Sequence, residues 1–302
     1  MAPENLSGRT IATYRLLERV GEGGTATVYR AEHAERGPCA VKILRAQSRQ
    51  DPTAVKRFLR EAGFGSRVVH DNVVHTWDYG EEDGLYYLAL EWASGKALGE
   101  YAAAQGPLPP AKVANIVSQL AGALGAAHAA GIIHRDLKPE NIIIDPTTGR
   151  VKLLDFGIAR DAEDNPAERL TRTGFFVGSL NYVAPEALSG ALVDDKADIF
   201  SLATIAYNLL SGRNPYDGRS PRELFQQLLT EEAKPLSQAG GPKVSKRVEQ
   251  VIMKSLAREP GARHQAVEIF ARDLQAAAEG APAAEESGPG VLGRFKRLFG
   301  GS

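Results

Sequence analysis

The segment His134-Arg135-Asp136-Leu137-Lys138-Pro139-Glu140-Asn141 follows a long apolar stretch, and Asp155-Phe156-Gly157 begins 14 residues after Asn141. Between them, residues 142–144 and 151–154 have the composition of two short strands. A hairpin of these strands would hold Asp136, Asn141 and Asp155 close together at facing strand ends. Asp and Asn oxygens are hard ligands that Mg²⁺ prefers, usually shared with a phosphate. Each residue alone is typical of a turn, so it is the set at this spacing that indicates a magnesium and phosphate site.

Near residues 92–95, well before this segment, the chain changes character from short β-type runs to a mostly helical pattern. This change predicts an α+β protein in two lobes, a small β-rich N-lobe at 14–91 and a larger helical C-lobe at 96–278, joined by a hinge at 92–95. Strands are predicted at 14–20, 27–31, 39–44, 73–79 and 85–90 with a helix at 52–66, and further helices at 110–130, 194–212, 221–231, 244–257 and 265–278.

A glycine-rich turn, Gly21-Glu22-Gly23-Gly24-Thr25-Ala26-Thr27-Val28, lies between two predicted strands. Such a turn lets backbone N–H groups approach phosphate oxygens without interference from Cβ atoms. A dinucleotide-binding turn would require a helix to begin at once and an acidic residue about 20 positions later. Here Thr27-Val28-Tyr29 continues as a strand and position 42 is a lysine, so that interpretation fails. A P-loop is excluded because no G-x-x-x-x-G-K-[ST] occurs.

Lys42 lies on the predicted strand Cys39-Ala40-Val41-Lys42-Ile43. A lone strand lysine usually points to solvent, but the neighbours of Lys42 are apolar. A buried lysine needs a partner, and we expect Glu61, on the helix that follows, to neutralise it.

Composition and charge describe an ordinary soluble globular protein. Of 302 residues, 43% are hydrophobic, and 36 Lys and Arg balance 37 Asp and Glu, so no basic field favours binding to nucleic acid. Cys39 is the single cysteine and fits a reducing cytoplasm. The stretch 113–133 lacks Asp, Glu, Lys and Arg but contains polar residues and glycines, which predicts a buried core helix and not a membrane span. The first residues do not resemble a secretion signal, so we expect a cytoplasmic protein.

These motifs together resemble the eukaryotic-like Ser/Thr protein kinases that are common in bacteria. The resemblance extends over residues 14–278 and includes, in order, the glycine loop, Lys42, Glu61, H-R-D-L-K-P-E-N, D-F-G and Ala184-Pro185-Glu186. It implies the bilobal kinase fold, use of ATP with Mg²⁺ or Mn²⁺, and protein Ser and Thr hydroxyls as substrates. The resemblance indicates Ser/Thr kinases and not tyrosine kinases, because of the sequence from Asp136 to Asn141 and the hydroxyl residue Ser179.

The resemblance also implies residue roles. Asp136 would accept or orient the hydroxyl proton, Lys138 would stabilise the transferred phosphoryl group, and Asn141 and Asp155 would hold metal ions, Asn141 counting as catalytic too. Leu90 takes the gatekeeper place, Asp198 would brace the catalytic loop, and Glu186 with Arg263 would secure the end of the activation segment. The residues implied to contact ATP are Val20, Gly21, Glu22, Gly23, Gly24, Thr25, Ala26, Thr27, Val28, Ala40, Lys42, Glu61, Glu91, Ala93 and Asp155.

Regulation is expected in the polar segment 158–183. Thr171 and Thr173 are candidate autophosphorylation sites, with Thr173 favoured, and Arg135 would pair with the phosphate. The plainer interpretation is two surface threonines. The departures from the family pattern, at Ala26, Ala203 and His264, remove no catalytic group. The alternative function is a nucleotide-binding scaffold with weak turnover that acts as an interaction module.

The two ends of the chain lie outside the family pattern. Residues 1–13 are an N-terminal extension, 279–290 a flexible linker and 291–302 a short basic amphipathic tail. Apolar residues at 291, 292, 295, 298 and 299 share one helical face, and three basic residues lie between them. We expect 291–299 either to contact a membrane surface or partner, or to be disordered or folded back. No pattern in the sequence defines an oligomeric state.

Overall fold

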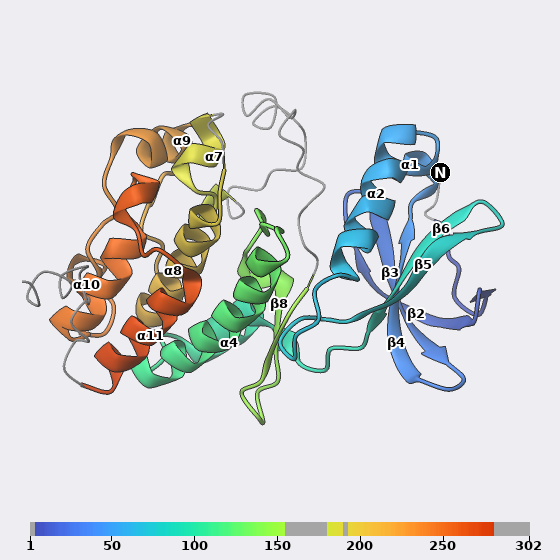
Figure 1. Cartoon of the computed structure of the whole chain (residues 1–302), viewed down its shortest axis with the longest axis horizontal. Helices are drawn as coiled ribbons and strands as arrows, with labels where there is room; N and C mark the ends of the chain where they lie inside the picture. The colour runs from blue at the N-terminus through green and yellow to red at the C-terminus, as the bar shows by residue number, and fades with distance from the viewer. Residues whose placement is uncertain (1–3, 155–179, 190–192, 281–302) are drawn as a thin grey trace, which may run out of the picture.

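The computed structural model of the chain describes residues 4–154, 180–189 and 193–280. It has two lobes, a β-rich N-lobe and a helical C-lobe, which lie side by side in Figure 1. The predicted α+β bilobal fold is therefore confirmed. Asp155, Thr171, Thr173, Ser179 and the tail lie outside the described residues.

The N-lobe is built on an antiparallel sheet with the strand order β1-β2-β3-β4-β6-β5. Alternate residues of β4, namely Cys39, Val41 and Ile43, are buried in the core of this lobe, while Ala40 and Lys42 face the other side of the sheet. The strands are β1 (Thr10–Ile11), β2 (Tyr14–Glu22), β3 (Ala26–His33), β4 (Gly37–Leu44), β5 (Thr76–Glu82) and β6 (Leu85–Glu91).

Residues before Tyr14 contribute to this sheet. Leu6 and Ile11 are buried in the same core as β4, and β1 pairs with the start of β2. The amide of Leu6 also donates a hydrogen bond to the hydroxyl of Tyr29, which lies fully buried on β3.

Two helices follow β4, a short α1 (Ala46–Arg49) and the longer α2 (Pro52–Gly65). Asp51 caps α2 by accepting a hydrogen bond from the amide of Thr53, and Pro52 occupies the first turn, where a missing N–H costs nothing. Phe58 and Ala62 are buried against the sheet face that carries Lys42. This packing turns the helix so that Glu61 faces β4.

The predicted strand at 73–79 begins only at Thr76. Its first residues instead cross to the C-lobe, where the Val74 amide donates to the carbonyl of Leu153 and the Leu153 amide donates to that of Asn72. The Asn72 side chain extends the contact by donating to Gln119 and to the carbonyl of Val151. The apolar β-type residues Val73 and Val74 thus connect the lobes instead of extending β5.

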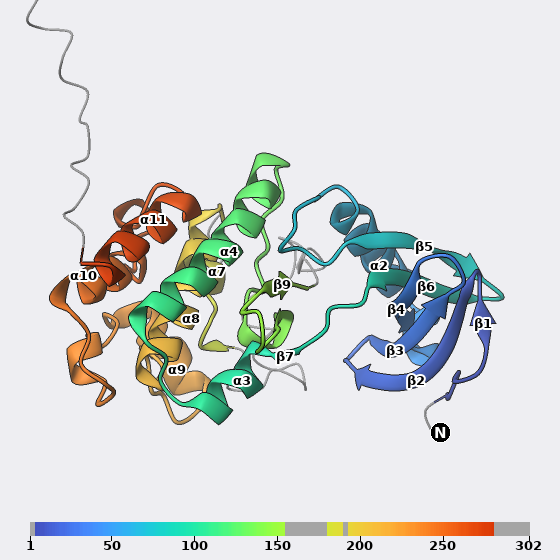
Figure 2. The ribbon, with the colours of Figure 1, turned by 90° about the horizontal axis from the view of Figure 1, so that it is seen from below.

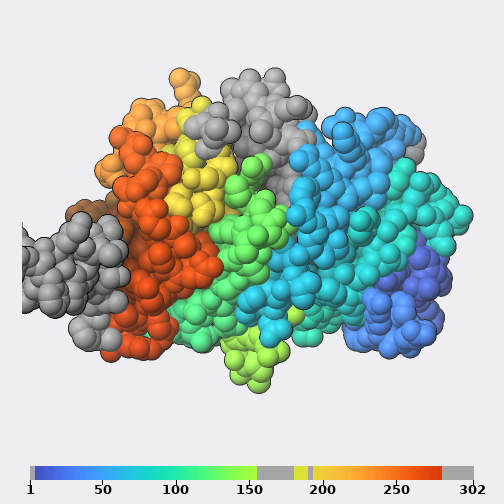
Figure 3. Space-filling view, in the orientation of Figure 1, coloured from blue at the N-terminus to red at the C-terminus, as the bar shows by residue number. Residues whose placement is uncertain are grey.

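This connection is visible on the surface. In Figure 3 the light-blue residues of the α2 region lie against the green residues of α4 (Pro110–Ala129). Arg67, just beyond α2, donates to the carbonyl of Ala130, just beyond α4, at 3.2 Å. The lobes are therefore joined on this side as well as through the hinge.

The C-lobe is organised around α4 and α8 (Lys196–Ser211), which is buried along nearly its whole length. The remaining helices cover this pair, as Figures 1 and 2 show. Longer helices are α9 (Pro221–Thr230), α10 (Lys246–Ser255) and α11 (Val267–Ala278), and shorter ones are α3 (Leu98–Gln105) and α7 (Pro185–Ser189). Among the described residues, no helix combines the length and the apolar character that crossing a bilayer would require.

A small sheet, β7-β8-β9, lies where the lobes meet (Figure 2). It is made of β7 (Lys96–Ala97), β8 (Ile142–Ile144) and β9 (Val151–Leu153), so the predicted hairpin is present. The chain enters β7 through Gly95, whose φ is 137° and whose missing Cβ would lie 2.2 Å from the carbonyl oxygen of Ile144. Only glycine allows the hinge to come this close to β8.

Candidate active site

Lys42 and Glu61 form the ion pair that the sequence predicts. The Nζ of Lys42 lies 2.7 Å from Oε1 of Glu61, and both side chains are mostly buried. The pair joins β4 to α2 across the face of the sheet. A lysine held this way presents a fixed positive charge to the space between the lobes.

Asp136 and its neighbours form a compact polar group after α4. The Nζ of Lys138 lies 2.9 Å from Oδ2 of Asp136. The side-chain amide of Asn141 donates to the carbonyl of Asp136 at 2.9 Å and to its carboxylate at 3.2 Å. The 3₁₀ turn at Pro139–Asn141 places Asn141 immediately before β8. Three of the predicted site residues are thus brought together.

Asp198 binds the backbone of the loop that carries Asp136, at His134 and Arg135. It lies fully buried at the start of α8, and its two oxygens accept hydrogen bonds from the amides of His134 and Arg135, both at 2.9 Å. His128 approaches the same carboxylate at 2.8 Å. Arg135 has a φ of 61°, a backbone conformation that is costly outside glycine. The buried carboxylate of Asp198 offsets this cost, because it accepts a hydrogen bond from the amide of Arg135 that the turn exposes.

The glycine-rich turn connects β2 and β3, and its glycines are not explained by the fold. Gly21, Gly23 and Gly24 lack the positive φ that favours glycine. A Cβ on Gly21 or Gly23 would make only ordinary contacts at 3.8 and 3.6 Å, and one on Gly24 would meet nothing within 4 Å. The folded chain would accept side chains here. Glycine is therefore consistent with close approach of a ligand to the backbone, as a phosphate would require.

One face of the N-lobe sheet forms an apolar wall beside Lys42. Directly paired residues of antiparallel strands share a face, and the register pairs Val28 with Lys42 and Ala40 with Leu90. Val28 and Ala40 are only partly buried, and Val20 on β2 remains 47% exposed. An apolar surface next to Lys42 is thus left uncovered by the chain itself.

The opposite wall comes from β8, through Ile143, which sequence reasoning missed. Ile142 and Ile144 are fully buried in the C-lobe core, whereas Ile143 is partly exposed. Ile143 pairs with Lys152, and Lys152 forms an ion pair at 2.7 Å with Glu91 at the end of β6. This pair shows that the shared face of β8 and β9 points toward the N-lobe. Alternation within three consecutive isoleucines was the available signal.

Glu91 ends β6, and Ala93 follows two positions later in the hinge. The amide of Glu91 donates to the carbonyl of His75 and its carboxylate accepts from the amide of His75, in addition to the contact with Lys152. The side chain of Glu91 is thus fully engaged in joining β6 to the C-lobe. Its backbone carbonyl is the group that could meet a base.

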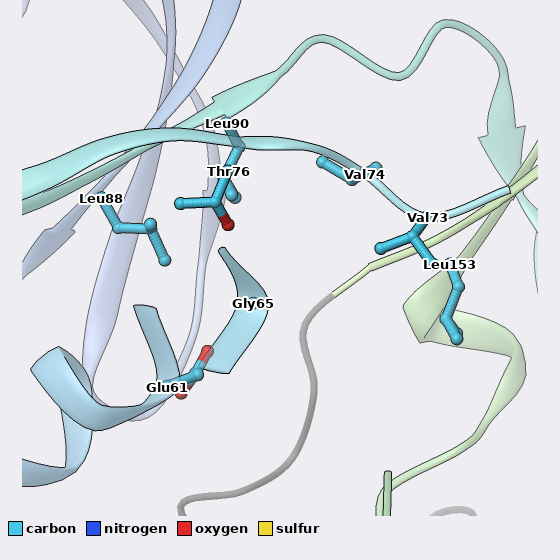
Figure 4. Close-up of a pocket in the computed structure, with 8 residues that line it drawn as sticks. All are labelled: Glu61, Gly65, Val73, Val74, Thr76, Leu88, Leu90 and Leu153. Carbon is cyan, nitrogen blue, oxygen red and sulfur yellow. The ribbon is translucent and has the colours of Figure 1, made fainter. Parts of the chain in front are cut away.

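Behind the sheet face, a small pocket extends between α2 and β6 (Figure 4). Leu88 and Leu90 approach it from β6, Glu61 from α2, and Leu153 from β9. Leu90 thus lines this inner pocket and pairs with Ala40 on the sheet, and its gatekeeper place stays a prediction.

Glu186 and Arg263 form the second predicted ion pair. The guanidinium donates to both carboxylate oxygens, at 2.7 and 2.8 Å, and Arg263 is almost completely buried. It also donates to the carbonyls of Ala257, Lys196 and Arg258. The pair fixes α7 to the residues after α10 and at the start of α8 in the C-lobe.

The metal site is described only in part. Among the described residues, no cluster of three His, Cys, Asp or Glu side chains could hold a cation, and Asp155 lies outside them. Asn141 fits the expected role, because its amide nitrogen binds Asp136 and its amide oxygen is the atom suited to a hard cation.

Comparison with known proteins agrees with this geometry. A family model described as the protein kinase domain matches residues 14–274. The chain is 38% identical over 276 residues to the serine/threonine-protein kinase PrkC of Bacillus subtilis, covering 91% of this chain and 41% of that protein. It is also 38% identical over 279 residues to the serine/threonine-protein kinase pkn3 of Myxococcus xanthus, covering 89% and 51%. The chain thus spans about half the length, or less, of these curated relatives.

A solved structure shows the same architecture. The PknI kinase domain of Mycobacterium tuberculosis matches with a TM-score of 0.69 and 31% sequence identity, over 89% of this chain and 97% of that one. The family model, the relatives and the fold coincide over the same residues that form the site. The chain therefore belongs to the protein kinase family, with a catalytic domain similar to those of bacterial Ser/Thr kinases.

Proposed function

We propose that the chain is an active Ser/Thr protein kinase domain, which transfers the γ-phosphoryl group of ATP to Ser and Thr hydroxyls of proteins. The observation that carries the proposal is the simultaneous presence of two assembled groups. Lys42 is paired with Glu61, and Asp136 is held by Lys138 and Asn141. The first group would bind the ATP phosphates and the second would act on the substrate hydroxyl, so together they supply the two halves of a transfer site.

ATP would lie between the two lobes. Val20, Val28 and Ala40 would cover the adenine from above and Ile143 from below, with the backbone of Glu91 and Ala93 at its edge. The backbone from Gly21 to Val28 would cover the phosphates. Lys42 would bind the α- and β-phosphates, since Glu61 fixes its charge at the sheet face.

The residues of the catalytic loop would divide the transfer between them. The substrate hydroxyl oxygen forms a bond to the γ-phosphorus while the bond from that phosphorus to the β,γ-bridging oxygen breaks, and ADP leaves. Asp136 orients the hydroxyl and accepts its proton, and Lys138 neutralises charge on the transferred group. Positioning and electrostatics supply most of the catalysis.

Asn141 and Asp155 would hold Mg²⁺, with Mn²⁺ as an alternative ion. The bound ion would supply positive charge that neutralises the phosphate oxygens during transfer. The oxygen donors of an amide and a carboxylate are of the class that these ions prefer.

Intact-mass spectrometry tests the proposal directly. The purified chain is treated with phosphatase, which is then removed, and incubated with Mg-ATP beside an Asp136→Asn variant. We expect phosphate to be added to the wild type alone. If the wild type binds nucleotide but neither gains phosphate itself nor phosphorylates a generic Ser/Thr substrate, the scaffold function replaces this one.

Peptide mapping of the same samples tests regulation. We propose autophosphorylation at Thr171 or Thr173, with Thr173 favoured and Arg135 as the partner of the phosphate. The basis is the sequence R-L-T-R-T-G at 169–174 together with Arg135 beside the catalytic aspartate. Modification elsewhere, with both threonines unmodified, would contradict this part.

The setting of the domain is part of the proposal as well. A single cysteine supports a cytoplasmic location, and the basic amphipathic pattern at 291–299 makes that segment a candidate for peripheral contact with a membrane or partner. Sedimentation with anionic liposomes, with and without residues 288–302, distinguishes these cases. Equal binding by both forms would contradict membrane contact.

A further inference from the structure

Arg45 lies between the glycine-rich turn and the strand of Lys42. It is the first residue after β4, three positions beyond Lys42, and it leads into α1. Its guanidinium lies 2.9 Å from Oε1 of Glu22 and donates to the carbonyl of Gly23 at 3.2 Å. Its backbone amide donates to the carbonyl of Thr25 at 2.9 Å. One residue therefore contacts the turn at three points, Glu22, Gly23 and Thr25.

The turn has few other contacts of its own. Residues 22–25 are exposed, and the space around Gly24 is open. Apart from the strand pairing at its base, the turn is closed by a hydrogen bond from the amide of Gly23 to the carbonyl of Ala26. A segment with so few buried contacts is free to open locally, so an added side-chain contact has a large share in fixing its position.

Glu22 gives this contact its geometry. Its carboxylate is held from two sides, with Oε2 at 3.0 Å from Arg19 and Oε1 at 2.9 Å from Arg45. The Arg45 side chain is 28% exposed and that of Arg19 is 42% exposed, so solvent screens the Arg45 pair less. Because the guanidinium is planar and presents several donors, Arg45 can hold Glu22 and the Gly23 carbonyl at once.

We propose that Arg45 is a positioning residue for ATP, which fixes the glycine-rich turn relative to Lys42. Arg45 directly follows β4, the strand that carries Lys42. Its contacts with the turn therefore fix the distance between Lys42 and the backbone that would cover the phosphates. The inference rests on the proposed function, in which both elements bind ATP. Arg45 acts through Glu22 and Gly23 and touches neither the substrate protein nor the reacting atoms.

The chain offers a matched control at Arg49. This arginine lies four residues further on, and its ion pair is with Glu4. Arg49→Ala removes the same charge and a similar ion pair from the same region of the N-lobe, without removing a contact to the turn.

The test compares Arg45→Ala, Arg45→Lys, Arg49→Ala and the wild type. The measurements are the Kd of a fluorescent ATP analogue with Mg²⁺, the KM for ATP, the KM for a peptide substrate, kcat and the thermal midpoint. We expect Arg45→Ala to raise the Kd and the KM for ATP on the order of three- to tenfold, the range of one hydrogen-bonded contact. We expect kcat and the KM for peptide to change by less than about twofold, since catalytic residues are untouched.

The remaining variants separate positioning from stability. Arg49→Ala should leave the Kd for the analogue unchanged. Arg45→Lys keeps the positive charge but lacks the planar guanidinium, so its Kd should lie between those of the wild type and Arg45→Ala. In a Glu22→Gln background, Arg45→Ala should have a smaller effect than in the wild type, because the two side chains act together.

Two results would overturn the inference. One is an unchanged Kd and KM for ATP in Arg45→Ala, and the other is equal losses in Arg45→Ala and Arg49→Ala that follow the thermal midpoint. Failure of the proposed function is distinguishable from either. If the wild type binds the analogue but transfers no phosphate, the kinase proposal is wrong, while the ratio of Kd values still decides the role of Arg45.

Discussion

At the scale of single residues, the clearest chemical consequence of the fold is an inert thiol at Cys39. Burial within the N-lobe core, with a smaller effect from the charge of Glu32, raises the pKa of Cys39 to about 11. Burial disfavours the thiolate, so at pH 8 only about one thiol in a thousand is ionised. We expect the native protein to resist alkylation by iodoacetamide at pH 8 and to react at once in denaturant. The alkylation is measured by mass spectrometry, and rapid modification of the folded protein would contradict this prediction.

Ile143 carries a second prediction at this scale. Ile143→Ala removes apolar surface from the wall of the proposed nucleotide site, and because the side chain is only partly buried, the fold should survive. Losing three carbon atoms from the contact with adenine should weaken ATP binding by about 1–2 kcal/mol, or five- to thirtyfold in Kd. Ile142→Ala, at a fully buried neighbour, should instead lower the thermal midpoint. If Ile142→Ala weakened ATP binding and Ile143→Ala lowered the thermal midpoint instead, Ile143 would not be the isoleucine that lines the site.

The same position shows how far the site follows from sequence. The sequence predicted Asp136 and Asn141 from their spacing, Lys42 and Glu61 from the apolar strand and the helix after it, and Lys138 from the family resemblance. The structure brings these five residues into two polar groups, and the assignments of their roles stay predictions. For Ile143 the signal was only the alternation expected within a short strand, and a contact such as Arg45 to Glu22 depends on where a strand ends beside a turn.

At the scale of elements, the attachment of α7 depends on one buried ion pair. Glu186→Gln leaves the guanidinium of Arg263, which is nearly inaccessible to solvent, without its charged partner. Breaking a buried pair from one side costs about 3–5 kcal/mol, so we expect a loss of that order in the free energy of unfolding by urea. Arg272→Ala, which breaks an exposed pair with Asp273, should cost about 0.5 kcal/mol or less. Similar stabilities for the two variants would show that the pair contributes little.

The elements themselves were predicted where periodicity is long and were missed where it is short. The helices α4 and α11 each repeat a buried face over three or more turns, α8 is a long run buried on nearly all sides, and all three appear near the expected positions. The helices α3 and α7 are too short to show a period and were not predicted. Val73 and Val74 have strand propensity, but tertiary hydrogen bonds to β9 decide the conformation of this segment.

At the scale of the whole molecule, the lobes are joined by two connections and by the nucleotide that would lie between them. The hinge enters β7 at Gly95, and the loop after α2 is bonded to β9 and α4. The ion pair of Glu91 with Lys152 adds a third contact beside the hinge. A ligand held by residues of both lobes adds its binding free energy to this interface, so it should stabilise the native protein as a unit.

This gives a prediction for thermal unfolding. At a concentration about 100 times its Kd, a non-hydrolysable ATP analogue with Mg²⁺ should stabilise the native state by about 2.7 kcal/mol. For a domain of this size, that corresponds to a rise of about 4–5 °C in the thermal midpoint, measured by scanning fluorimetry. Lys42→Met should show a much smaller rise at the same concentration, because the charge that binds the phosphates is gone while the apolar walls remain. An equal rise in both proteins would place the phosphates away from Lys42, and the site would then have to be sought outside the face shared by β4 and α2.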